Sequence, residues 1–175
     1  AFSQSVAAQE NALQGVEKKL RKDPQDQQAL KRKEKLESKL ERLGVKEYEW
    51  RVRQHPTDRE LRLKLGHAYY QRGDVQSAIG AFQQAARDQR LEEEAAAMMG
   101  RCFMQKGQYD MAVEQLRRAI DRHGTFDDKG MELNYQLARA LEQTGETEEA
   151  LKIYKKIYTN DIGFRDVAEK VESLG

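Results

Sequence analysis

Residues able to perform acid–base, nucleophilic or metal chemistry are few in this chain and lie at unrelated positions. The histidines are His55, His67 and His123, and the one cysteine is Cys102. The sequence has no phosphate-binding glycine loop, no paired-histidine metal motif and no nucleophile elbow. The carboxylate run 92–94 falls in the expected first turn of a helix, where negative charge suits the helix dipole. We therefore expect no enzymatic activity, no metal site and no cofactor, and we interpret Cys102 as a packing residue.

The elements that position the remaining side chains follow from a repeat of small and large residues. Gly66 and Gly100 lie 34 residues apart, and a further step of 38 residues leads from Gly100 to Ala138. The same two intervals relate Ala78, Ala112 and Ala150. The chain is therefore a tandem array in which one unit is followed by a four-residue insertion.

Helix is the expected state of every unit. The sequence has two prolines, Pro24 and Pro56, and no long run of β-branched residues. Each unit has one central glycine, at Gly73, Gly107 and Gly145, where a first helix can end in left-handed geometry before a second begins. The fold class predicted from the sequence is all-α.

This order of small and large residues resembles the tetratricopeptide repeat family, whose unit is a helix-turn-helix of 34 residues. The resemblance implies a right-handed α-solenoid of antiparallel helix pairs. It covers residues 59–161 as three units, at 59–92, 93–126 and 131–161. We expect the insertion at residues 125–128 to lengthen the loop between the second and third units, and residues 162–175 to form a helix that caps the array.

Residues 1–58 are expected to form amphipathic helices with one degenerate repeat unit. Tyr48 and Pro56 occupy the family's large aromatic and terminal proline positions, whereas Gly44 and Arg51 depart from its pattern. An alternative remains open, because leucines 36, 40 and 43 form a narrow seam with flanking charges, as in a short coiled coil. Such a seam would support structural self-assembly of the chain.

The resemblance also implies that the first helix of each unit lines a concave groove. Arginine, tyrosine and methionine are common at interface hot spots, and glutamines can hydrogen-bond to a peptide backbone. Our hypothesis is that the groove binds a protein or peptide partner with acidic and apolar residues, Arg101 and Arg139 contacting its anions. The predicted groove residues are His67, Tyr70, Gln71, Arg101, Met104, Gln105, Tyr135, Arg139 and Glu142.

One known use of such grooves does not match this sequence. Family members that clamp a terminal carboxylate use lysine and asparagine at set positions, which here hold Leu63, His67, Met98, Glu132 and Gln136. Chaperone-tail binding is therefore not expected. The function predicted from the sequence is a non-enzymatic scaffold or adaptor for protein–protein interaction, of bacterial type.

Charge and hydropathy limit the other classes of partner. Residues 1–56 carry 13 basic and 9 acidic residues, the remainder carries 18 and 21, and the net charge is +1. Because carboxylates are interleaved with the cations, we do not expect nucleic-acid binding. No apolar run is long enough to span a membrane, and no signal-peptide pattern precedes the helices, so a cytoplasmic location is favoured.

Overall fold

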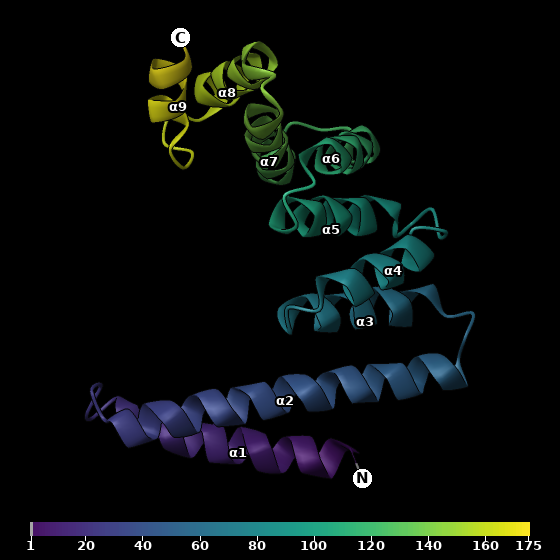
Figure 1. The fold of residues 1–175 in the computed structure, drawn as a ribbon, viewed down its shortest axis with the longest axis vertical. Coiled ribbons are helices and arrows are strands. Elements are labelled where there is room, and N and C mark those ends of the chain that lie inside the picture. The colour runs from purple at the N-terminus through teal and green to yellow at the C-terminus, as the bar shows by residue number, and fades with distance from the viewer. Residues whose placement is uncertain (1) are drawn as a thin grey trace.

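The structure, a computed structural model, describes residues 2–175, whose chain runs through nine helices in an open array (Figure 1). The helices are α1 (Phe2–Leu20), α2 (Gln27–Gln54), α3 (Arg59–Gln71), α4 (Val75–Ala85), α5 (Glu92–Gln105), α6 (Tyr109–His123), α7 (Asp128–Thr144), α8 (Thr147–Asn160) and α9 (Val167–Leu174). Residues 2–175 contain no strand, which confirms the predicted all-α class.

Packing runs almost entirely between helices that are consecutive in sequence, and α5 also touches α7. The helical hairpin of α1 and α2 lies at one end of the array and α9 at the other (Figure 1). Such a chain is stabilised by each pair and by its contacts with adjacent pairs, as in solenoid proteins.

Local sequence signals set the helix ends. After α3, α5 and α7 the chain turns at Gly73, Gly107 and Gly145, which have φ angles of 80°, 69° and 87°. Only glycine adopts this left-handed geometry at little cost. The carboxylates of Asp58 and Asp74 accept backbone N–H groups at the starts of α3 and α4, and thereby cap them.

The small repeat positions allow a large side chain of the same helix pair to approach the backbone. A Cβ atom added to Gly66 would lie 2.6 Å from the ring of Phe82, and one added to Gly100 would lie 2.7 Å from Cγ of Leu116. Phe82 and Leu116 are fully buried. The structure thus places each of these two side chains against the glycine of its own unit.

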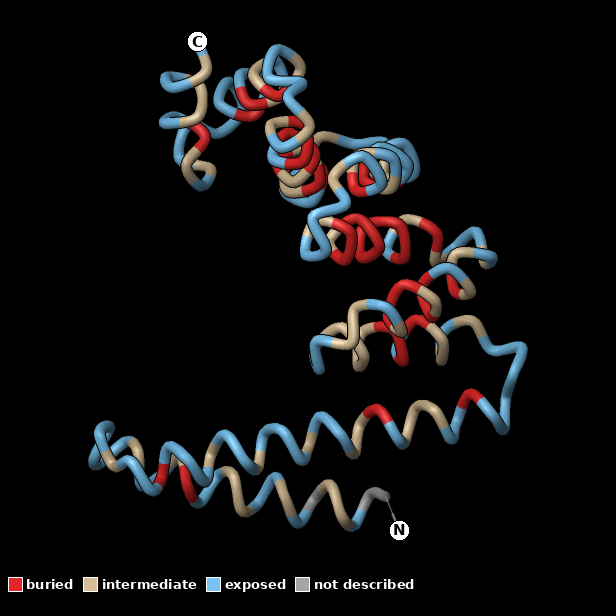
Figure 2. Tube along the Cα trace, in the orientation of Figure 1, coloured by how far each residue is buried: buried red, intermediate tan, exposed pale blue. Residues whose placement is uncertain are grey.

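The main hydrophobic core extends without interruption from Leu63 in α3 to Val167 in α9. A smaller cluster joins Val52 of α2 to Leu65 and Ala81. Buried residues are therefore dense in the three helix pairs and sparse in α1 and α2 (Figure 2). The N-terminal hairpin is attached to the array through the C-terminal part of α2.

Helix α2 differs from the expected degenerate unit. It runs unbroken through residues 27–54, so this stretch forms one helix and not a helix-turn-helix. The position that corresponds to Gly73 is Lys39, which has no tendency to terminate a helix, and Gly44 lies within the helix.

Leu36 and Leu40 of the leucine seam lie on the side of α2 that packs against α1, whereas Leu43 borders a surface pocket. Ala29, Leu36 and Leu40 share one face of α2 by helical spacing, and Ala29 lines a pocket together with Val16 of α1. Leu36, Leu40 and Leu43 are each half-buried. The intramolecular hairpin therefore covers part of the surface that the self-assembly alternative requires.

The four-residue insertion lengthens the flanking helices and not the loop: α6 has 15 residues, compared with 11 in α4. Helix α7 starts at Asp128 and has 17 residues, compared with 14 in α5. Asp127 caps it by accepting the N–H of Gly130 at 2.9 Å. The loop between α6 and α7 spans only residues 124–127, so the expectation of a longer loop was wrong.

Candidate partner-binding groove

A cleft of about 940 Å³ runs across the inner ends of α3, α5 and α7 and reaches the C-terminal segment. Side chains from α3 and α5 line one part of it, and α7 supplies the largest share. Arg165 and Lys170 extend the lining beyond the three repeats. The lining residues are Tyr70, Gln71, Gly73, Arg101, Met104, Gln105, Tyr109, Glu132, Tyr135, Gln136, Arg139, Glu142, Gln143, Arg165 and Lys170.

A chain of polar contacts crosses this groove from α5 to the C-terminal segment. Arg101 donates from Nε to Oε1 of Gln136 at 3.2 Å, and Gln136 donates to Glu132 at 2.6 Å. The other oxygen of Glu132 accepts from Nε and Nη2 of Arg165 at 2.9 and 2.8 Å. These polar contacts link α5, α7 and the C-terminal segment, and they fix the positions of the three relative to one another.

Aromatic residues support the groove beneath Arg165. The Arg165 guanidinium lies 5.0 Å from the ring centre of Tyr135, and Phe164 meets the same ring edge-on at 6.0 Å. The Tyr135 hydroxyl donates to Asp166 at 2.5 Å, and burial together with this bond raises the pKa of Tyr135 to about 12. Because Tyr135 is only 6% exposed, it acts mainly as a support for the groove.

A second ion pair closes the end near α9. Glu142 accepts from Nζ of Lys170 at 2.8 Å and also from the hydroxyl of Tyr154. Burial, followed by the contact with Glu142, raises the pKa of Tyr154. Both carboxylates that line the groove, Glu132 and Glu142, are thus engaged by cations of the C-terminal segment.

Arg101 and Arg139 therefore supply the positive charge that the groove's own carboxylates do not compensate. Arg101 donates to the neutral amide of Gln136, and it forms no ion pair within residues 2–175. Arg139 is exposed, and no ion pair of residues 2–175 includes it. An anion entering the groove would meet two guanidinium groups from adjacent repeats, which can form charge-assisted hydrogen bonds.

The structure brings together eight of the nine predicted groove residues. His67 is the exception: its Nε2 lies 2.8 Å from Glu94 Oε1, and its ring meets Phe82 edge-on at 5.3 Å. The sequence did not indicate Tyr109, Arg165 or Lys170. Arg165 and Lys170 lie outside the repeats, so no repeat position could place them in the groove.

Residues 2–175 hold no cluster of three or more histidine, cysteine or carboxylate side chains that could bind a metal ion. Burial raises the pKa of the Cys102 thiol to about 11, so this residue is a poor nucleophile. Among the helices of the described chain, none is both long and apolar enough to cross a membrane.

Stacked helix pairs of this kind define a helical-repeat scaffold. The family model of the tetratricopeptide repeat matches residues 43–90, 63–101 and 97–163, and the chain belongs to this family. The family's fold serves protein–protein interaction, and its members are in general non-enzymatic. No curated protein matches the chain in sequence.

Solved structures share the fold at low sequence identity. A crystal structure of MamA is 22% identical, with a TM-score of 0.62, covering 97% of this chain and 92% of that one. MamA 41-end from Desulfovibrio magneticus RS-1 has a TM-score of 0.69 at 16% identity, over 99% and 85% of the two chains. TTC0263, a thermophilic tetratricopeptide protein in Thermus thermophilus, has a TM-score of 0.58 at 21% identity, over 98% and 92%.

Proposed function

We propose that the chain is a non-enzymatic adaptor whose groove binds a peptide or a partner helix rich in acidic and apolar residues. The observation that carries the proposal is the pair Arg101 and Arg139, which project from adjacent repeats into one cleft without a carboxylate partner. Tyr70 and Met104 are partly exposed beside them and offer apolar contact. Gln71, Gln105 and Gln143 offer amides to a peptide backbone.

A solved structure with the same fold holds a peptide ligand. The first tetratricopeptide domain of Spaghetti (RPAP3) was solved bound to the HSP90 peptide SRMEEVD, and matches 66% of this chain at 11% identity with a TM-score of 0.58. That ligand contains two glutamates and apolar residues. The chemistry proposed for this groove is of the same kind, although the terminal-carboxylate clamp residues differ.

The experiment is selection from a library of random linear peptides with the immobilised protein. We expect the selected peptides to be enriched in aspartate or glutamate beside apolar residues, and the Arg101→Glu, Arg139→Glu variant to lose them. An Arg87→Glu, Lys155→Glu variant is the matched control, because both of its sites are exposed cations outside the groove. Selection of basic peptides, or of the same peptides by both variants, contradicts the proposal.

A further inference from the structure

Helix α2 separates charges that are mixed in the sequence. At 3.6 residues per turn, Lys35, Lys39, Arg42 and Lys46 fall within a sector of about 60°. The carboxylates Glu34, Glu37 and Glu41 are centred about 140° away by the same geometry, whereas Glu49 lies near the ridge side and accepts the hydroxyl of Tyr69 at 2.8 Å. The four cations, which we call the basic ridge, line one surface pocket of about 350 Å³ with Ser38 and Leu43. The argument from interleaved charges therefore does not hold for this face of α2.

The basic ridge is free of internal ion pairs. In the described part of the chain the ion pairs of α2 are Lys33–Glu37 and Arg51–Glu47, and neither includes a ridge residue. All four ridge side chains are exposed. Their charge is therefore available to a partner, and the row from Lys35 to Lys46 spans about 17 Å of straight helix.

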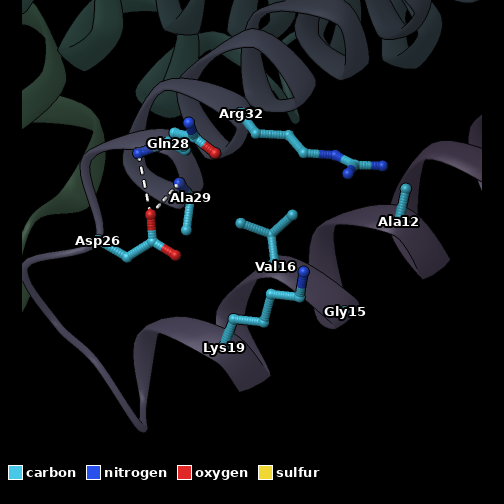
Figure 3. A pocket seen from close by; sticks show the side chains of 8 residues that line it. All are labelled: Ala12, Gly15, Val16, Lys19, Asp26, Gln28, Ala29 and Arg32. Atoms are coloured by element: carbon cyan, nitrogen blue, oxygen red, sulfur yellow. Dashed lines mark hydrogen bonds between the residues drawn. The ribbon is translucent and has the colours of Figure 1, made fainter.

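The ridge continues toward the hairpin turn, where α1 joins it. Arg32 of α2 and Lys19 of α1 lie on either side of Val16, and Ala29 lines the same pocket (Figure 3). Val16 and Ala29 are 4% and 6% exposed. Asp26 borders this pocket, but its carboxylate accepts the N–H groups of Gln28 and Ala29, both at 3.0 Å. An anion that enters this pocket would therefore meet two cations beside the apolar side chains of Val16 and Ala29.

The other end of the ridge holds the chain's single tryptophan. Trp50 follows Lys46 by four residues and precedes Arg53 by three, so all three share the ridge side of α2. Trp50 is 48% exposed. A half-exposed indole beside lysines suits the interfacial zone of a bilayer, where the ring and the alkyl stems lie in apolar surroundings and the cations reach headgroups.

We propose that the basic ridge binds the surface of an anionic lipid bilayer. A straight row of cations on the flank of a hairpin can contact a flat anionic surface along its whole length, whereas a two-helix hairpin is wider than the major groove of DNA, about 12 Å. Single-stranded nucleic acid is bound by several stacked aromatics, and this face has only Trp50. Clusters of four to eight lysines and arginines on a helix are typical of anionic lipid binding.

Such binding would leave the groove free. The groove is lined from α3, α5, α6, α7 and the C-terminal segment, and the ridge lies on α2. The inference does not depend on the proposed groove ligand. It adds a location to the adaptor: a peripheral position on an anionic membrane, with the groove open to a second partner.

The test is sedimentation of the full chain with two kinds of vesicle, one of phosphatidylcholine alone and one of phosphatidylcholine and phosphatidylserine in equal parts. We expect binding only to the anionic vesicles, weakened by added salt. The Lys35→Gln, Lys39→Gln, Arg42→Gln, Lys46→Gln variant should lower the partition coefficient at least about 100-fold. A control that replaces Lys64, Arg72, Arg87 and Lys155 by Gln removes equal charge elsewhere and should bind as the wild type does.

Trp50 provides a second readout in the same experiment. Its emission should shift to shorter wavelength when anionic vesicles are added, because the indole enters a less polar environment. Absence of vesicle binding, equal loss in the ridge and control variants, or binding without a shift of Trp50 emission would overturn the proposal. The proposal would also be overturned if the protein did not bind the vesicles but bound an oligonucleotide or polyglutamate, and if the ridge variant lost that binding.

Discussion

At the residue scale, Gly100 shows how a missing side chain determines the spacing of a helix pair. Any Cβ at this position would lie 2.7 Å from Cγ of Leu116, which is fully buried in the close-packed core. We expect Gly100→Ala to lower the free energy of unfolding by about 1 to 3 kcal/mol through overpacking. Urea unfolding followed by circular dichroism measures the change.

The matched control is Gly80→Ala in α4. Gly80 is also helical, and an added Cβ there meets nothing within 4 Å. Since alanine favours helix over glycine by about 0.5 to 1 kcal/mol, this variant should be as stable as the wild type or more stable. Equal destabilisation by the two substitutions would show that the contact with Leu116 is not the cause.

The contribution of His123 to the stability of the protein should depend on pH. Asp127, at 2.6 Å from Nε2, is the main cause that raises the pKa of His123, and Glu93 at 3.2 Å from Nδ1 adds to it. Because the pKa of His123 is higher in the folded than in the unfolded protein, the protonated histidine stabilises the fold. This contribution is complete below the unfolded-state pKa near 6.5 and is lost as the pH rises through the folded-state pKa.

We therefore expect the difference in unfolding free energy between wild type and His123→Gln to be largest below pH 6.5 and to shrink at higher pH. Denaturant unfolding across the neutral range measures it. The pKa of its partner Asp127 is lowered to about 2, chiefly by the hydrogen bond from the Gly130 N–H. Asp127 therefore titrates far below this pH range. A difference that grows with rising pH would contradict the assignment.

At the element scale, helix caps differ between equivalent repeat positions. The Asp74 carboxylate accepts the N–H of Ser77 at the start of α4, whereas Gln108, which holds the equivalent position before α6, makes no such bond. Asp74→Ala should cost about 1 kcal/mol of stability, and Gln108→Asp should add about 0.5 to 1 kcal/mol. Thermal unfolding would detect both changes, and a destabilising Gln108→Asp would show that α6 needs a different cap.

Some helices could be predicted from the sequence alone and others could not. The intervals of 34 and 38 residues predict α3 to α8, because packing of each pair requires a small residue at Gly66 and Gly100. They do not predict the unbroken α2, whose continuity depends on the absence of a turn residue at Lys39. Nor do they place Arg165 and Lys170 in the groove, because tertiary contacts with Glu132 and Glu142 bring these residues there.

At the scale of the whole molecule, the hairpin of α1 and α2 bears on self-association. Because Leu36 and Leu40 of the seam lie on the side of α2 that packs against α1, we expect the protein to remain a monomer of 20.3 kDa as its concentration rises. Light scattering after size exclusion measures the mass. A mass that increases with concentration, and returns to the monomer value on replacing Leu43, would favour the self-assembly alternative.

The central claim is that the groove, and no other surface, recruits the protein partner. The most direct measurement is capture of partners from a lysate of the source organism, comparing the wild type with the Arg101→Glu, Arg139→Glu variant after circular dichroism has shown both to be folded. We expect a partner that the wild type retains and the variant loses, while the Arg87→Glu, Lys155→Glu control still retains it. Recovery of the same partners by all three proteins would contradict the account.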